Sequence, residues 1–112
     1  MIDSYSFGQI VIGGKRYTND VIIFPNRVKD NWWRKMGHRL SIEDLNEVIQ
    51  EKPEILVVGT GYFGSMKVLT DVEEYLKGKE IKLITQPTKD ACNTFNLLKS
   101  NKKVVAALHL TC

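Results

Sequence analysis

The chain has 112 residues, of which 43% are hydrophobic and 26% are charged. This is the size of one ordinary domain, residues 1–112, and the composition excludes a disordered or fibrous chain. There are 16 lysines and arginines against 13 aspartates and glutamates, so the net charge is +3. That small excess does not by itself indicate a nucleic-acid-binding protein.

Several classes of protein are excluded by what the sequence lacks. No apolar run approaches the roughly 20 residues that cross a bilayer, and the first residues lack the basic and apolar regions of a secretory signal. The two cysteines, Cys92 and Cys112, are too few for a disulfide scaffold or a zinc site. We therefore expect a cytoplasmic protein with no membrane contact, no metal and no cofactor.

The first half of the chain predicts antiparallel strands followed by one helix. Tyr5–Ile12 and Lys15–Thr18 are strand-like runs joined by two glycines, which predicts a hairpin. Val21–Phe24 is a short apolar run typical of a buried strand. A helix is expected from Ser41, where apolar residues recur at helical spacing, to Pro53, which ends it.

The second half alternates between strands and helices. Strand-like runs cover residues 54–58, 81–85 and 103–110, and helical patterns cover 70–77 and 88–100. Thr70 and Glu73 are spaced as a capping box, and Thr88 is placed to cap the next helix. The alternation implies right-handed crossovers and parallel strands. The predicted fold class is α/β (mixed α+β), with a central mixed sheet, an N-terminal antiparallel hairpin, a C-terminal β-α-β-α-β half and about three helices.

A glycine-rich segment follows the first strand of that half. Gly59, Thr60 and Gly61 begin a match to G-x-G-x-x-G that ends at Gly64. A dinucleotide site is poorly supported, because the next helix starts six residues after Gly64, no carboxylate follows the next strand and the chain is too short for two mononucleotide halves. A structural turn and a loop whose amides line a pocket for another small or anionic group both remain open.

The candidate ligand-binding residues are Gly59, Thr60, Gly61, Thr88 and His109. Ligands of parallel sheets lie beyond the carboxyl ends of the strands, which is where these residues fall. The start of the helix at Thr88 adds free amides and a positive dipole end. No acid–base pair is evident, so the site could bind a ligand without catalysis.

The chain end offers a second candidate chemistry. His109 and Cys112 could form a nucleophilic pair, or they could be a partly buried histidine and an inert terminal thiol. Cys92 lies on the apolar face of its helix, which favours a place in the core.

A basic aromatic cluster, Trp32, Trp33 and Arg34, is the candidate interface. It lies within the segment from Arg27 to Arg39, where most of the excess positive charge is found. Adjacent tryptophans cover core edges or anchor partner proteins. Binding of single-stranded nucleic acid by stacking is a minor alternative.

Four segments, in their order along the chain, resemble a known family. They are GGKRYTNDVIIFP, NWWRKMGHRLSIEDL, PEILVVGTGYFG and TFNLLKSNKKVVAALHLTC. The family consists of small single-domain proteins of unknown function, and it includes a mitochondrial complex I assembly factor and an adipogenesis-associated cytosolic protein. The resemblance implies a mixed α/β domain with a pocket near the glycine loop, and no demonstrated reaction. It also implies recurrent residues at Asp20, Trp33, Gly59, Thr60, Gly61, Asn96, His109 and Thr111.

Two alternative functions are therefore predicted. The first is a non-enzymatic binding or assembly module with a protein partner, a small pocket at Gly59–Gly61 and possible homo-oligomers. The alternative is a small-molecule or anion-binding enzyme that uses the same loop. Whether the protein is an enzyme is left open at this point.

Overall fold

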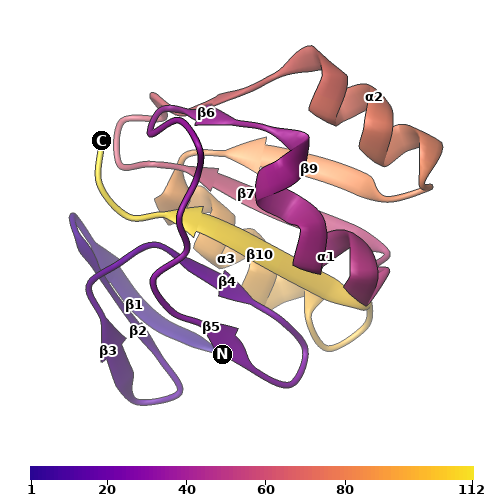
Figure 1. Ribbon diagram of the computed structural model, residues 1–112. Helices are drawn as coiled ribbons and strands as arrows, with labels where there is room; N and C mark the ends of the chain where they lie inside the picture. Colours follow the sequence, from indigo (N-terminus) through magenta and orange to yellow (C-terminus); the bar gives the residue numbers. More distant parts are fainter.

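A mixed five-stranded sheet forms the centre of the molecule (Figure 1). The computed structural model describes residues 1–112. The strands lie in the order β5-β4-β10-β7-β9, with β10, β7 and β9 parallel and β4 and β5 antiparallel. The predicted mixed sheet is confirmed. The strand bounds are β4 Val21–Ile23, β5 Val28–Lys29, β7 Ile55–Thr60, β9 Lys82–Gln86 and β10 Val104–His109.

Helices cover both faces of this sheet, because its central strands are apolar on both sides. Along β10, Val105 and Ala107 face the core beneath α1 and α2, whereas Ala106 and Leu108 face the core beneath α3. The predicted β-α-β-α-β half is confirmed. None of the helices is both long enough and apolar enough to cross a membrane. The bounds are α1 Asn46–Glu51, preceded by a 3₁₀ turn at Ile42–Leu45, α2 Thr70–Gly78 and α3 Thr88–Leu98.

The N-terminal strands form a separate antiparallel sheet beside α3. Gly13 and Gly14 join β2 to β3 with φ of 55° and 82°, as a tight hairpin turn requires. The prediction of one strand over Tyr5–Ile12 was wrong, because the chain reverses at Gly8, where φ is 79°. The bounds are β1 Ile2–Ser6, β2 Gln9–Ile12 and β3 Lys15–Tyr17.

The threonines that begin α2 and α3 do not cap these helices as predicted. The cap positions are Leu69 and Pro87, and neither side chain makes a capping hydrogen bond. The hydroxyl of Thr88 is used in tertiary contacts instead. Ser41 does begin its helical segment, and its main-chain N–H donates to the carboxylate of Asp44 at 2.9 Å.

Two further details differ from the sequence-based expectation. Gly59 and Thr60 belong to β7, although they were expected in the following loop. A short parallel pair joins β6, Arg39–Leu40, to β8, Lys67–Val68. Strands of two residues are too short to show a periodic pattern, so neither was expected.

Candidate functional site

The five predicted ligand-binding residues meet where β7, α3 and β10 come together (Figure 1). The Thr88 hydroxyl accepts a hydrogen bond from the Gly61 N–H at 2.9 Å and donates to the main-chain oxygen of His109 at 2.6 Å. Thr60 donates its hydroxyl to a main-chain oxygen at the end of β9. At Gly59, a Cβ atom would lie only 2.8 Å from the Thr88 hydroxyl. These residues therefore lie close together, whereas their role in binding a ligand stays a prediction.

Three amides of the glycine-rich loop are bonded within the protein. The Gly61 N–H bonds to Thr88, the Tyr62 N–H donates to the Thr111 oxygen at 2.8 Å, and the Gly64 N–H donates to the Gly61 oxygen at 3.2 Å. At Gly61, φ is 105°, and a Cβ would lie 2.6 Å from the Thr111 oxygen. A phosphate cradle needs several free amides that point to one place. In this chain the loop instead closes tightly on the C-terminal segment.

A buried ionic network lies beside this joint. Asp20, which immediately precedes β4, accepts from Arg34 at 2.7 Å and contacts Nδ1 of His109 at 2.8 Å through the same oxygen, Oδ2. Its Oδ1 accepts from the Leu110 N–H at 2.8 Å. Arg34 also donates to the Gly37 oxygen from both Nε and one terminal nitrogen. These bonds connect three distant segments of the chain.

The tautomer of His109 follows from its neighbours. Nδ1 lies 2.8 Å from Asp20 and 3.0 Å from a terminal nitrogen of Arg34. An arginine can only donate, so Nδ1 cannot bond to both groups in one protonation state. We assign the proton to Nδ1, where it is donated to the carboxylate at the shorter distance. Nε2 is then a buried acceptor, and it has no hydrogen-bond partner.

The network holds Asp20 in its charged form. Burial alone would raise the pKa of Asp20, but hydrogen bonds from His109, from the Leu110 N–H and from Arg34 outweigh that effect. The pKa therefore falls below its usual value of 3.8. The side chain of Arg34 is only 5% exposed, so the Asp20 carboxylate is its main compensation for lost hydration. The arrangement is that of a structural ion pair with an adjacent histidine.

Only one of the three predicted interface residues is exposed. Trp33 is 79% exposed, whereas Trp32 is 5% exposed and donates its indole N–H to the Asp44 oxygen. Arg34 is held in the buried ion pair. Trp32 and Arg34 therefore have structural roles, which corrects their predicted place at an interface. All three residues line one surface hollow, with Arg34 stacked over the Trp32 ring, but only Trp33 offers an exposed side chain.

A surface hollow of about 440 Å³ adjoins Trp33. Asp20, Arg34, Lys35 and Thr111 also line it. Its walls are therefore formed partly by the edge of the ionic network and partly by the C-terminal segment. The residues of the glycine-rich loop do not line it.

Three more exposed aromatic side chains, Phe7, Tyr62 and Phe63, form a cluster of their own. Phe7, Tyr62 and Phe63 are 52%, 50% and 70% exposed, and their ring centroids lie 5.0 to 6.4 Å apart. The Tyr62 N–H bonds to Thr111, which also lines the hollow beside Trp33. We call Phe7, Trp33, Tyr62 and Phe63 the aromatic face. Three of its members were missed, although two consecutive aromatics in a glycine-flanked loop were a visible signal.

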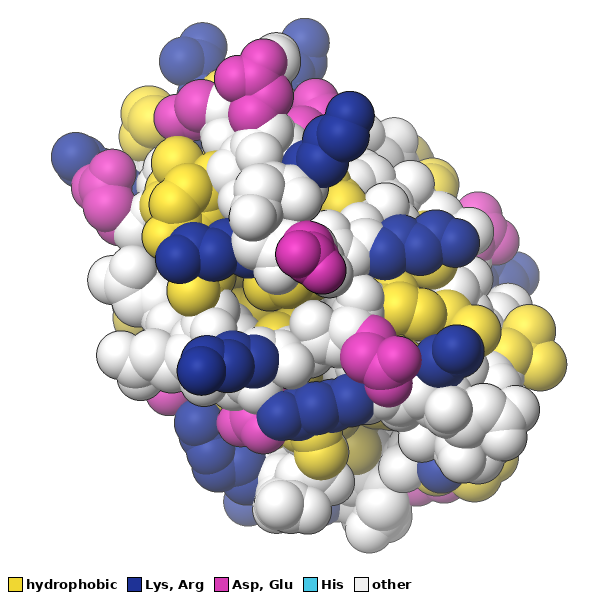
Figure 2. Space-filling view, turned by 90° about the vertical axis from the view of Figure 1, so that its right-hand side faces the viewer, with side chains coloured by type: hydrophobic (Ala, Val, Ile, Leu, Met, Phe, Trp, Pro, Cys, Tyr) yellow, Lys and Arg dark blue, Asp and Glu magenta, His cyan; other side chains and the backbone are white.

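The opposite end of the molecule is different in character. Figure 2 shows Lys and Arg side chains interspersed with Asp and Glu side chains, with hydrophobic groups between them. Charges of both signs alternate over this side, and no extended surface of one sign is visible on it. Such a surface is typical of a solvated face.

The cysteines and the remaining titratable groups form no second site. Cys92 is buried, and burial raises the pKa of its thiol to about 12. Cys112 is exposed and makes no hydrogen bond to His109, whose Nδ1 is paired with Asp20. No cluster of three or more His, Cys, Asp or Glu side chains is arranged to hold a metal ion.

Comparison with known proteins finds relatives that match almost the whole chain. The chain is 32% identical over 110 residues to NADH dehydrogenase [ubiquinone] 1 alpha subcomplex assembly factor 3 of Danio rerio, covering 96% of this chain and 62% of that protein. The Homo sapiens assembly factor of the same name is 30% identical over 109 residues, covering 95% of this chain and 58% of that protein. The chain thus spans about three fifths of the length of these relatives.

The fold matches a solved structure over the whole chain. A conserved hypothetical protein from Pyrococcus horikoshii OT3 superposes with a TM-score of 0.86 and 28% identity, covering 100% of this chain and 99% of that one. The model of one family, described as a protein of unknown function (DUF498/DUF598), matches residues 2–109. The expected resemblance to a family that includes a complex I assembly factor is confirmed. The chain therefore belongs to the DUF498/DUF598 family of proteins of unknown function.

Proposed function

We propose that residues 1–112 act as one domain that binds a partner protein and does not catalyse a reaction. The observation that carries this proposal is the aromatic face: Phe7, Tyr62 and Phe63 form one exposed cluster, Tyr62 is bonded through its main chain to Thr111, and the exposed Trp33 lines a hollow with Thr111. Aromatic residues are enriched in the centres of protein interfaces, where they contribute a large share of the binding energy. The proposed occupant is a protein segment that presents apolar side chains to these rings.

The geometry of the rings suits this role. Phe7, Tyr62 and Phe63 already pack against one another with interplanar angles of 55° to 76°. Because they are ordered before binding, little side-chain entropy is lost when a partner covers them. The main chain beneath is held by the bond from Tyr62 to Thr111, so the rings are presented from a fixed support.

The relatives support a protein partner. The curated relatives are named as assembly factors of NADH dehydrogenase, and assembly of a complex is a role exercised on proteins. We carry over only that class of role, namely binding to a protein during assembly. The cytoplasmic location and the specific partner remain predictions.

A small-molecule or anion-binding enzyme is the second candidate, and one observation favours it. Nε2 of His109 is unpartnered while Nδ1 is held by Asp20, which is the arrangement of an oriented general base. Nε2 is buried, however, and the exposed His38 ring packs edge-on against His109 with 6.0 Å between centroids. A thermal-shift screen against nucleotides, coenzyme A and phosphorylated metabolites at millimolar concentration tests this candidate. A raised Tm would support it, and no change would remove it.

The protein-binding proposal is tested with two alanine variants and a matched control. A partner captured from the source cells is purified and titrated against wild type, Trp33→Ala, Phe63→Ala and Tyr75→Ala. Tyr75 is an exposed aromatic residue on α2, outside the aromatic face. We expect each of the first two variants to weaken binding by roughly 30-fold, as for hot-spot residues, and the control to bind like wild type. Unchanged binding by both variants, with native circular dichroism, would overturn the proposal.

A further inference from the structure

The sheet has one unpaired parallel edge, at β9. The Lys82 N–H donates to the Glu54 oxygen at 3.0 Å, so Lys82 directs its main-chain groups toward β7. Main-chain groups alternate in direction along a strand. Leu83 and Thr85 therefore direct both N–H and C=O away from the sheet, where no strand of this chain lies.

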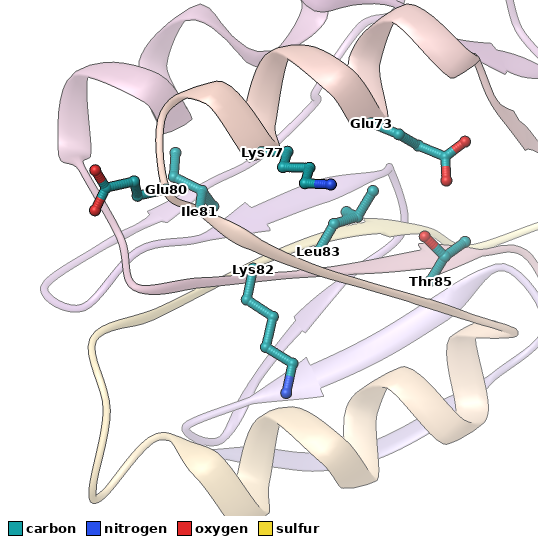
Figure 3. A pocket seen from close by; sticks show the side chains of 7 residues that line it. All are labelled: Glu73, Lys77, Glu80, Ile81, Lys82, Leu83 and Thr85. Carbon is teal, nitrogen blue, oxygen red and sulfur yellow. The ribbon is translucent and has the colours of Figure 1, made fainter.

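The side chains at this edge are incompletely covered. Leu83 packs partly against the core beneath α2, and Ile84 packs partly against the core beneath α3, yet both remain half-buried. Figure 3 shows Leu83 and Thr85 directed toward α2, and Lys82 directed toward α3. A hollow of about 520 Å³ lies between α2 and β9, so the helix does not cover the edge of the strand.

We propose that this edge pairs with the same edge of a second copy of the chain. In an antiparallel pairing with its two-fold axis at Ile84, Leu83 lies opposite Thr85 of the second copy. Both residues direct their main-chain groups outward, so the two such pairs exchange four hydrogen bonds. Ile84 then lies opposite its own counterpart, as a close pair between the bonded ones. The pairing joins two five-stranded sheets into one continuous sheet.

The charges on α2 fit a second copy of this chain in particular. Glu73 and Lys77 are exposed, lie four residues apart and both line the hollow. Glu73 lies toward Thr85, and Lys77 lies toward Leu83 (Figure 3). Because the two-fold axis sets Thr85 opposite Leu83, it brings Glu73 of each copy toward Lys77 of the other. An interface in which one surface complements itself is the requirement for a symmetric dimer.

The strand itself presents no charge conflict in this register. Lys82 lies opposite the neutral Gln86 of the second copy, so like charges are not opposed. The edge also lies outside the aromatic face, because it shares no residue with it. Dimer formation and partner binding can therefore fail independently, and the two proposals are tested by separate variants.

Sedimentation equilibrium on the full chain tests the dimer, with Thr85→Pro as the first variant. Proline removes an outward N–H and adds bulk at the edge, but leaves the bonds to β7 intact. We expect wild type to sediment at twice the chain mass of 12.8 kDa at concentrations of about 100 μM. Thr85→Pro should sediment at the monomer mass with an unchanged circular dichroism spectrum. A monomeric wild type at about 1 mM, or a folded Thr85→Pro dimer, would overturn the proposal.

Charge reversal keeps the proposal testable if the proline variant does not fold. Glu73→Lys and Lys77→Glu each replace two attractive contacts with two repulsive ones, so each should raise the dimer Kd by roughly tenfold. The double variant restores opposite charges and should dimerise like wild type. An equimolar mixture of the two single variants should form a heterodimer. Equal dimerisation by all variants, or a double variant as weak as the singles, would refute the self-pairing.

Discussion

Replacing Asp20 by asparagine removes the charge that compensates a buried arginine while keeping the size of the side chain. The amide can still accept from the Leu110 N–H, but its other end can no longer accept charge-assisted bonds from both Arg34 and His109. The guanidinium of Arg34 remains where it is, 5% exposed, with little water to replace the lost carboxylate.

The expected loss of stability follows from these contacts. Breaking a buried pair by removing one partner costs about 3–5 kcal/mol, and each hydrogen bond to a charged group contributes about 1.5–3 kcal/mol. Asp20 keeps 16% of its side-chain surface exposed, which favours the lower end of that range. We expect Asp20→Asn to lose about 3 kcal/mol of unfolding free energy. With an m-value of about 2 kcal/mol/M, the urea midpoint falls by about 1.5 M.

Urea unfolding at two pH values checks both the size and the cause of this effect. The pKa of Asp20 is lower in the folded chain than its usual value of 3.8, so its stabilisation is present above pH 3.8. It is lost as the pH falls through the folded pKa, because the carboxyl group then becomes protonated. The difference between wild type and Asp20→Asn should therefore be largest at neutral pH and shrink below pH 3.8.

The control for this experiment is Asp71→Asn, at an exposed aspartate in the first turn of α2. This variant should lose no more than about 1 kcal/mol of unfolding free energy, since only an interaction with the helix dipole is removed. A loss below about 1 kcal/mol for Asp20→Asn, or the same loss at neutral pH and below pH 3.8, would refute the account of the ionic network.

Three more predictions address the joint and the cysteines. Gly61→Ala should lower the free energy of unfolding, measured with urea, by about 3 kcal/mol, because its φ is 105° and a Cβ would lie 2.6 Å from a main-chain oxygen. Its control is Gly14→Ala, where φ is 82° but the space around a Cβ is open, and the free energy of unfolding should fall by only about 1 kcal/mol. Thr88→Val should lower the free energy of unfolding by about 2 kcal/mol, because the buried N–H of Gly61 and the buried C=O of His109 lose their partner. Thr88→Ser keeps the hydroxyl and should lose less stability. Equal losses by the two variants would contradict this role of the hydroxyl. Cys112 should react with a thiol reagent in the native protein, whereas Cys92, with a pKa of about 12, should react only on unfolding; two equally fast thiols would be inconsistent with the structure.

The central sheet was predictable because its strands have patterns that local chemistry determines. Ile55–Thr60 and Val104–His109 are apolar on both faces, which is typical of a buried parallel strand, and the helical stripes between them indicate crossovers. The turn at Gly8 was missed because strand-like residues flank it on both sides. The β6–β8 pair depends on tertiary packing and leaves no local pattern.

The candidate site was predictable only in part. Gly59–Gly61, Thr88 and His109 lie at or just beyond the carboxyl ends of strands, and parallel strands bring such residues together. The contact between Asp20 and His109 joins residues 89 positions apart, and neither the spacing nor the composition indicates it. The difference between Trp32 and Trp33 also needs the structure, because one backbone step turns one indole into the core and the next into solvent.

Site-specific photocrosslinking from the aromatic face tests the partner-binding role most directly. A photoreactive phenylalanine analogue replaces Trp33 or Phe63 in turn, with Tyr75 as the control position on α2. Our account predicts a discrete adduct with the same partner protein from positions 33 and 63 and none from position 75. The absence of an adduct from both face positions, or the same adduct from position 75, would contradict it.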